Sequence, residues 1–315
     1  MGVSARTVSR VVNGEAVVSR ATRDRVLEAI DQLGYRPNLL ARGLINQRSG
    51  MIALMVTSMA NPFFPEFADG VRAAATDHGL TLVLTSSEDE AAAQERLLRD
   101  LASHSVEGLI AFSAFDGHDS LAEAARGGLP VVVVNERSTD PDVLSVRADM
   151  CHGAQLAVEH LVGIGRSRVG MVAGELDESH PRWREHGFRS ACAEHDLGCR
   201  SICTEAATID GGDAATKTLL EQHPDLDGIF AYNDLMAIGA IRALERSGRN
   251  VPHDVAVVGF DDITIGAFVT PALTTIRIDR YKLGRLAVDT LVDVRAGNRP
   301  VPPLLDVELI PRVSA

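Results

Sequence analysis

From residue 51 onward, short apolar runs rich in Val, Ile and Leu alternate with longer stretches that show the apolar spacing of helices. The runs are MIALMVT (51–57), LTLVLTS (80–86), GLIAFS (108–113), PVVVVN (130–135), RVGMVAG (168–174), GIFAY (228–232) and VAVVGF (255–260). Continuous apolar strands separated by helices are typical of parallel sheets that are covered on both faces. Seven or more strands in a chain of 315 residues favour an α/β fold with two doubly wound sheets. A single β/α barrel is the alternative.

The charge of the chain is divided unevenly along the sequence. Residues 1–49 contain eight arginines and four acidic residues, a net charge of +4, whereas the whole chain carries −12. The remaining residues therefore carry −16. Such an asymmetry indicates a small basic segment that binds nucleic acid, joined to a larger acidic body.

Several classes of protein are excluded by the motifs that the chain lacks. Its only lysines are Lys217 and Lys282, and because neither follows a glycine, a Walker A phosphate loop is impossible. The sequence also contains no H-E-x-x-H zinc helix and no G-x-S-x-G nucleophile elbow. We therefore expect a protein that is not an enzyme and has no cofactor. The absence of a long apolar window, a signal-type start and a C-x-x-C pair predicts a cytoplasmic protein without membrane contact.

One group of potential zinc ligands falls within twelve residues and consists of Cys192, His195, Cys199 and Cys203. The first two lie on an expected helix and Cys203 on a following strand. An apolar cysteine in the core and a histidine on the surface explain this pattern better than a metal does. We expect no metal site.

Polar residues follow several of the apolar runs. Ser58 and NPFF (61–64) follow the first run, Asn135 the fourth, Asn233-Asp234 the GIFAY run, and Asp261-Asp262 the VAVVGF run. Any one of them can cap the next helix, and for Asn233 and Asp234 capping is the favoured interpretation. Because ligands of open α/β sheets bind at the carboxyl ends of strands, the recurrence predicts a ligand cleft.

The basic segment reads as two helices. Residues 4–13 form the first, with Ser4 as its cap and Gly14 at its end, and Ser19 caps a second that ends at Gly34. The polar face of the first helix presents Ala5, Arg6, Ser9 and Arg10. Arginine on such a face can donate two hydrogen bonds to guanine, although a merely solvated face is the default for two arginines.

Several segments carry a specific resemblance. They are VSARTVSRVVNG (3–14), VSRATRDRVLEAIDQLGYRPN (18–38), ARGL (41–44), NPFF (61–64), VEHLVGIGRSRVGMVAG (158–174), GIFAYNDLMAIGAIRALERSG (228–248), VPHDVAVVGFDD (251–262) and TPALTTIRID (270–279). In type and order they resemble the LacI/GalR family of bacterial transcription regulators over nearly the whole chain. The resemblance implies a helix-turn-helix headpiece that binds a pseudo-palindromic operator as a homodimer. It also implies a core like that of periplasmic binding proteins, which holds a small effector between two subdomains.

The resemblance assigns a domain to each part of the chain. Residues 1–36 correspond to the headpiece, 37–49 to a hinge helix and 50–315 to the effector-binding core. Within the core, the first subdomain is expected at about 50–164 and 277–304, and the second at about 165–276 and 305–315. No heptad repeat follows Val301, so a dimer is expected.

The resemblance also assigns residues to DNA. Ala5, Arg6 and Arg10 correspond to base-reading positions of the recognition helix, and Leu44 corresponds to the side chain that enters the minor groove. The positions expected to contact the DNA backbone or flank these contacts are Ser4, Thr7, Ser9, Asn13, Asn38 and Ala41. Members of the family have a further helix upstream, which is missing here because Met1 directly precedes the turn at Gly2. We expect that the start was assigned too late, and the alternative is a headpiece that binds its operator poorly.

The expected effector site consists of Ser58, Phe63, Phe64, Arg184, Ile209, Asn233 and Asp261. Aromatic faces stack on rings, while Arg, Asn and Asp fix hydroxyls or ring nitrogens. A sugar or sugar derivative is therefore the expected effector, with a nucleobase or nucleoside as the alternative. A solute-binding protein of an importer shares this core and is the competing function, but the headpiece and hinge sequences argue against it.

Overall fold

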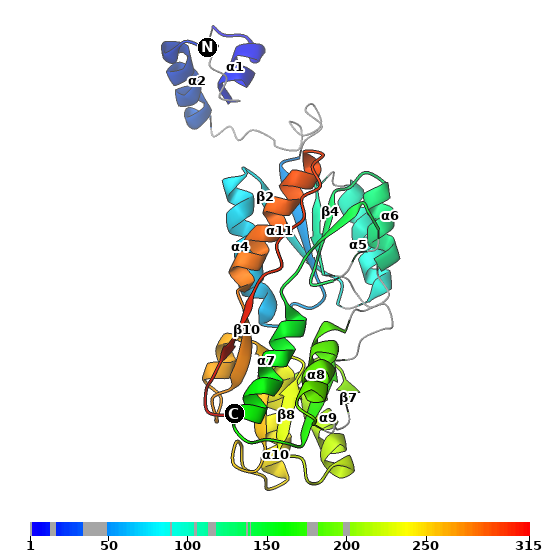
Figure 1. Cartoon of the computed structure of the whole chain (residues 1–315). Coiled ribbons are helices and arrows are strands. Elements are labelled where there is room, and N and C mark those ends of the chain that lie inside the picture. The colour runs from blue at the N-terminus through cyan, green and yellow to red at the C-terminus, as the bar shows by residue number, and fades with distance from the viewer. Residues whose placement is uncertain are drawn as a thin grey trace. The chain divides into compact units, whose positions relative to one another are not determined.

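The computed structural model (Figure 1) describes residues 2–12, 17–33, 49–88, 90–103, 106–112, 118–136, 138, 140–174, 182–197 and 202–315. By its internal contacts the chain divides into two compact units, Met1–Gly50 and Met51–Ala315. These are called the headpiece and the core.

The described helices of the headpiece are α1 (Ala5–Val12) and α2 (Arg20–Gln32), which contact each other. The hydroxyls of Ser4 and Ser19 accept hydrogen bonds from backbone N–H groups three residues further on, as the sequence predicts. Val11 and Val26 are buried, so the apolar faces of the two helices make a small core.

The first lobe of the core is a five-stranded parallel sheet in the order β2-β1-β3-β4-β5. Its strands are β1 (Met51–Val56), β2 (Thr81–Ser86), β3 (Leu109–Ala111), β4 (Val131–Val134) and β5 (Val143–Val146). Its helices are α4 (Phe63–Asp77), α5 (Ala91–Ser103), α6 (His118–Arg126) and α11 (Arg280–Arg295). Helices α4 and α11 cover one face of the sheet, and α5 and α6 cover the other (Figure 1).

The second lobe is a six-stranded sheet in the order β11-β10-β9-β8-β6-β7, in which only β11 is antiparallel. Its strands are β6 (Val169–Gly174), β7 (Ile202–Glu205), β8 (Gly228–Ala231), β9 (Ala256–Asp261), β10 (Thr274–Ile278) and β11 (Val307–Ile310). Its helices are α7 (Met150–Gly163), α8 (Trp183–Glu194), α9 (Ile209–Gln222), α10 (Asp234–Arg246) and the 3₁₀ turn η1 (Thr264–Ala267). Helices α7 and α8 lie on one face, and α9 and α10 on the other.

Each of the seven apolar runs forms a strand, and the expectation of two doubly wound sheets is confirmed. The barrel is excluded because each sheet has two edges. Strands β5, β7, β10 and β11 were not among the seven runs, although a strand was expected at Cys203 in β7. Polar residues interrupt them, as in VLSV (143–146) and VELI (307–310), so their apolar signal is weak.

The expected subdomain boundary near residue 164 is wrong. Helix α7 packs against the second sheet, where Gly153 lies so close to Phe260 that a Cβ would stand 2.7 Å from the ring. The chain therefore crosses between the lobes before Met150. Two crossing segments are joined to each other, because Leu305 pairs with Ala148 in a parallel bridge.

Candidate functional site

Both sheets share one topological feature that locates a site. Counted from its own first parallel strand, each has the order 2-1-3-4-5, so the strand order reverses between β1 and β3 in the first lobe and between β6 and β8 in the second. Ligands of doubly wound sheets bind beyond the carboxyl ends of the strands at such switch points. The residues that follow these strands are therefore the candidates for a binding site.

At the first switch point the side chains are aromatic. Phe63, Phe64 and Phe67 come from the start of α4, and Phe112 follows β3. The Phe112 ring lies edge-on to the other three, with centroid distances of 5.0 to 5.9 Å. The predicted residues Phe63 and Phe64 are thus brought together, whereas Phe112 was not predicted although it lies in the apolar run 108–113. Ser58, which precedes this cluster, accepts a hydrogen bond from the N–H of Ala60 (3.2 Å).

At the second switch point the centre of the site is Arg184, near the start of α8. Its guanidinium carbon lies 4.3 Å from the ring centroids of both Tyr232 and Phe260. Its Nη2 donates to Asp261 Oδ1 over 3.1 Å, and both side chains are buried. Two rings and one carboxylate therefore hold this cation away from water, and the predicted pair Arg184 and Asp261 is brought together.

Burial controls the titration of the groups around Arg184. Removal from water raises the pKa of Asp261 to about 6, although the positive charges of Arg184 and Arg280 oppose this rise. Burial also raises the pKa of Tyr232. Desolvation thus outweighs the attraction of the nearby guanidinium at Asp261.

The last two predicted effector residues lie at the beginnings of helices. Asn233 is buried and caps α10, because its Oδ1 accepts from the N–H of Met236 (2.9 Å) while its Nδ2 donates to the carbonyl of Ala207 (3.3 Å). Ile209 is the half-buried first residue of α9. Neither residue makes a hydrogen bond or ion pair with Arg184 among the described parts of the chain, so the capping role of Asn233 is the one that the geometry displays.

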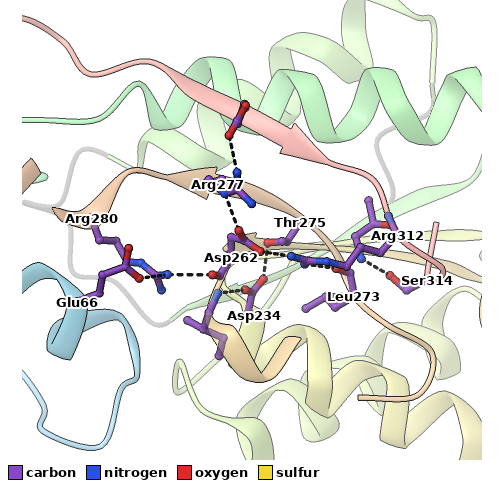
Figure 2. A network of polar contacts seen from close by, with 12 residues as sticks. Glu66, Asp234, Asp262, Leu273, Thr275, Arg277, Arg280, Arg312 and Ser314 are labelled. Atoms are coloured by element: carbon purple, nitrogen blue, oxygen red, sulfur yellow. Dashed lines mark hydrogen bonds and ion pairs between the residues drawn. The ribbon is translucent and has the colours of Figure 1, made fainter. Parts of the chain in front are cut away.

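A polar network fixes the loop after β9 (Figure 2). Asp262 accepts from Arg277 (2.7 Å) and Arg312 (2.5 Å). Asp234 is fully buried and accepts from Thr275 (2.5 Å) and from the N–H of Ile263 (2.7 Å). Burial raises the pKa of Asp234 well above its usual range, and the negative charge of Asp261 adds to the rise. These contacts hold the backbone that follows Asp261.

The same loop is tied to the first lobe by Arg280. Its Nη2 contacts Glu66 Oε2 of α4 (2.5 Å) and donates to the carbonyl oxygen of Asp262 (3.0 Å), as Figure 2 shows. A cavity of about 600 Å³ lies beside this contact, lined among others by Asp262, Phe268, Glu308 and Arg312. The sequence did not predict this cavity, because its lining comes from five separate segments.

The headpiece residues assigned to DNA are only partly described. Arg6 is exposed and Arg10 is half-buried on α1, while the hydroxyls of Ser4 and Thr7 lie 3.0 Å apart. The side chains of Ala5 and Ser9 and all of Asn13, Asn38, Ala41 and Leu44 lie outside the described residues. The described headpiece thus offers one exposed arginine on the expected recognition face.

No group of three or more metal-ligating side chains occurs within the described ranges. Cys192 and Cys203 are buried apolar residues, His195 ends α8, and Cys199 is outside the described residues. No described helix is both long and apolar enough to cross a membrane.

Two family profiles match the chain. The profile of bacterial regulatory proteins of the lacI family matches residues 1–38. The profile of periplasmic binding proteins and the sugar binding domain of the LacI family matches residues 49–302. Together they account for most of the headpiece and the core.

Individual proteins are similar over most of their length. The ribose operon repressor of Halalkalibacterium halodurans is 34% identical over 290 residues, which is 92% of this chain and 86% of the relative. The cellobiose complex of the transcriptional regulator CelR has a TM-score of 0.78 and 34% identity, with 100% of this chain and 97% of that chain covered. The lac repressor dimer bound to operator and the anti-inducer ONPF has a TM-score of 0.88 and 28% identity, with 99% and 96% covered.

Proposed function

Because this chain belongs to the LacI family of bacterial regulatory proteins, we propose that it is a transcriptional repressor whose affinity for operator DNA is controlled by a small effector. One observation carries the proposal. A single chain joins a basic segment with two helices to a core that presents a buried Arg184–Asp261 pair at a sheet switch point. A protein that only bound a solute would have no use for the basic segment.

The operator is proposed to be read by α1. Arg6 and Arg10 supply guanidinium groups that can contact base edges, and Ser4, Thr7, Ser9 and Asn13 supply short polar groups for phosphates. Asn38, Ala41 and Leu44 complete the proposed DNA contacts. The lac repressor, which is similar in structure, binds its operator as a dimer. We extend this arrangement to a homodimer of the present chain on a pseudo-palindromic site.

The effector is proposed to be a sugar or sugar derivative held between the two lobes. Phe63 and Phe64 offer ring edges and faces from the first lobe, while Arg184 and Asp261 offer charged hydrogen-bonding groups from the second. Ser58, Ile209 and Asn233 are assigned to the rim of the same site. The cellobiose complex of CelR and the ribose operon repressor support a sugar over a nucleoside.

The regulatory mechanism follows from a site made by two lobes. An effector that contacts both lobes favours one angle between them, and in a dimer that angle sets the spacing of the two headpieces. Coupling between two such sites is typically about 1 to 3 kcal/mol, or roughly 5- to 150-fold in affinity. We therefore expect the effector to change operator affinity by a factor in this range.

The test uses DNA from the region upstream of the gene that encodes the chain, with footprinting at several salt concentrations. We expect protection of a pseudo-palindromic site and a change of its affinity on addition of the sugar that binds most tightly. The double variant Arg184→Met/Asp261→Asn removes both buried charges together, because removal of one partner alone costs about 3–5 kcal/mol. It should retain the footprint and lose the response to the sugar.

The matched control is Arg189→Met on the same helix, because among the described residues this exposed arginine pairs only with Glu185. The control should respond to the sugar like the unaltered protein. Absence of any sequence-specific footprint would contradict a repressor, and a normal sugar response in the double variant would contradict the assigned site.

A further inference from the structure

Arg147 has an unusual environment for an arginine that lies partly buried next to a binding site. It follows β5 in the segment that crosses to the second lobe, and its guanidinium carbon lies 5.2 Å from the centroid of the Trp183 ring. Within the described part of the chain, no hydrogen bond or ion pair reaches its side chain. All the N–H donors of this cation are therefore available.

Two further donors in the first turn of α8 are buried without a partner in the described residues, and one of them belongs to the Trp183 ring on which Arg147 lies. They are Nε1 of Trp183 and Nε of Arg184, which are neighbours in the first turn of α8. The first turn of α8 also lacks a side-chain cap, so backbone N–H groups at this helix end are not satisfied by a capping side chain. A buried donor without an acceptor costs about 1–3 kcal/mol, so several in one place indicate an acceptor supplied from outside.

The arginines of the polar network in Figure 2 provide the contrast. Arg277 and Arg312 both pair with Asp262, and Arg280 pairs with Glu66. Arg280 also has a buried Nε without a partner, but its charge is compensated. Arg147 has no such carboxylate, and a cation held on an aromatic face next to unsatisfied donors is suited to an anion.

We propose that Arg147, Trp183 and the start of α8 bind a carboxylate or phosphate group on the effector, so that the effector is an anionic sugar derivative. This inference rests on the proposed function, because it concerns the same site. The anionic group of the effector then contacts Arg147, which lies in the crossing segment, and the N-terminus of α8, which belongs to the second lobe. Anions are also favoured at a helix N-terminus by the helix dipole.

Two carboxylates near the site limit the charge that it accepts. Asp261 is compensated by Arg184, and Glu136 is buried with an interaction of its own. Arg147 is thus the cation that remains for a ligand. The site therefore fits one carboxylate or one phosphate. A ligand with several negative charges would be repelled by the carboxylates of Asp261 and Glu136.

The experiment uses the fact that Trp183 is the only tryptophan of the chain, so intrinsic emission reports on this site directly. The full chain is titrated with glucose, glucuronate and glucose 6-phosphate, and with ribose and ribose 5-phosphate. We expect an anionic sugar to bind at least tenfold more tightly than its neutral counterpart, with the advantage decreasing as salt increases. The carboxylate and phosphate arms identify which anion is recognised.

The variant Arg147→Gln should reduce that advantage to less than threefold and leave the affinity for the neutral sugar within twofold. The control Arg126→Gln removes an exposed arginine of the same lobe that pairs with Asp140, and should retain the full advantage. Equal binding of neutral and anionic sugars, or an advantage that persists in Arg147→Gln, would overturn the anion inference and leave the repressor proposal intact. Each sugar is tested up to 10 mM, which is on the order of ten times a weak Kd of 1 mM. Binding of none of the five would overturn the inference and remove sugars from the proposed function. Footprinting tests the repressor proposal separately.

Discussion

The two lobes of the core have the same strand order, but their switch points present opposite chemistry. In the first lobe four phenylalanine rings meet beyond β1 and β3. In the second lobe a buried arginine lies between two rings and contacts a carboxylate at the end of β9. Topology therefore locates the site in both lobes, while the side chains at the strand ends decide what each lobe contributes.

This difference has energetic consequences. The aromatic wall consists of Phe63, Phe64, Phe67 and Phe112. It is stabilised by burial and ring contacts, which do not depend on pH. The charged wall consists of Arg184, Asp261 and the neighbouring Asp234. Desolvation raises the pKa values of both carboxylates, so the contribution of this wall to the free energy of unfolding depends on pH. Substitutions on the two sides should therefore produce distinguishable signatures.

The largest effect is expected on the aromatic side. Phe67 is fully buried and contacts both Phe63 and Phe112, so Phe67→Ala should lower the free energy of unfolding by about 3–5 kcal/mol. Urea unfolding followed by circular dichroism measures the change. The loss should be the same at pH 5 and pH 7.5, and a loss that varies with pH would remove the distinction between the two walls.

A smaller and pH-dependent effect is expected on the charged side. Because the pKa of Asp261 is raised to about 6 in the folded chain, that state binds more protons than the unfolded chain between about pH 4 and 6. The free energy of unfolding therefore decreases as the pH rises through this window, by about 1 kcal/mol between pH 5 and 7.5 for this group.

The variant Asp261→Asn does not titrate at this position. Leaving Arg184 unpaired lowers the free energy of unfolding of this variant, but the difference from the unaltered protein should shift in favour of the variant by about 1 kcal/mol from pH 5 to 7.5. Asp234, whose pKa is also raised by burial, contributes in the same direction in both proteins and so cancels in the difference. A difference that stays constant with pH would show that Asp261 is ionised throughout.

The sequence was sufficient for most of the fold because the central strands are continuous apolar runs. It was not sufficient for the boundary at α7, since the order of strand and helix does not reveal which sheet a helix at a crossing will cover. The close approach of Gly153 to Phe260 that decides the question is visible only in three dimensions.

The site was predictable in part for the same reason. Polar residues after strands identified Asp261, and a family resemblance identified Arg184, but neither indicated that the two form a pair. The aromatic residues Phe112 and Tyr232 lie near the ends of apolar runs and were interpreted only as part of the strands. Arg147 carried no signal at all, because its partner Trp183 is 36 positions away in the chain and no motif connects them.

The smallest effect is expected where the two walls are joined. Glu66 from the first lobe pairs with Arg280, which also donates to the backbone of Asp262 in the second. The Glu66 side chain is 47% exposed, so solvent screens the pair and Glu66→Gln should change the free energy of unfolding by less than about 0.5 kcal/mol. The pair lies within the first lobe, but it positions Arg280 for its hydrogen bond to the Asp262 carbonyl and so favours the observed angle between the lobes. Its removal should therefore weaken binding of the tightest sugar by about two- to fivefold, a coupling below 1 kcal/mol.

Trp183 emission measures the sugar affinity, and urea unfolding measures the stability. The control is Asp69→Asn on the same helix, whose carboxylate pairs only with Arg72 within α4 and makes no contact between lobes among the described residues. If both variants weaken sugar binding equally, the effect comes from the charge of α4 and not from the connection between the lobes. If Glu66→Gln alone weakens it, the ion pair couples an apolar wall and a charged wall that are otherwise stabilised by different forces.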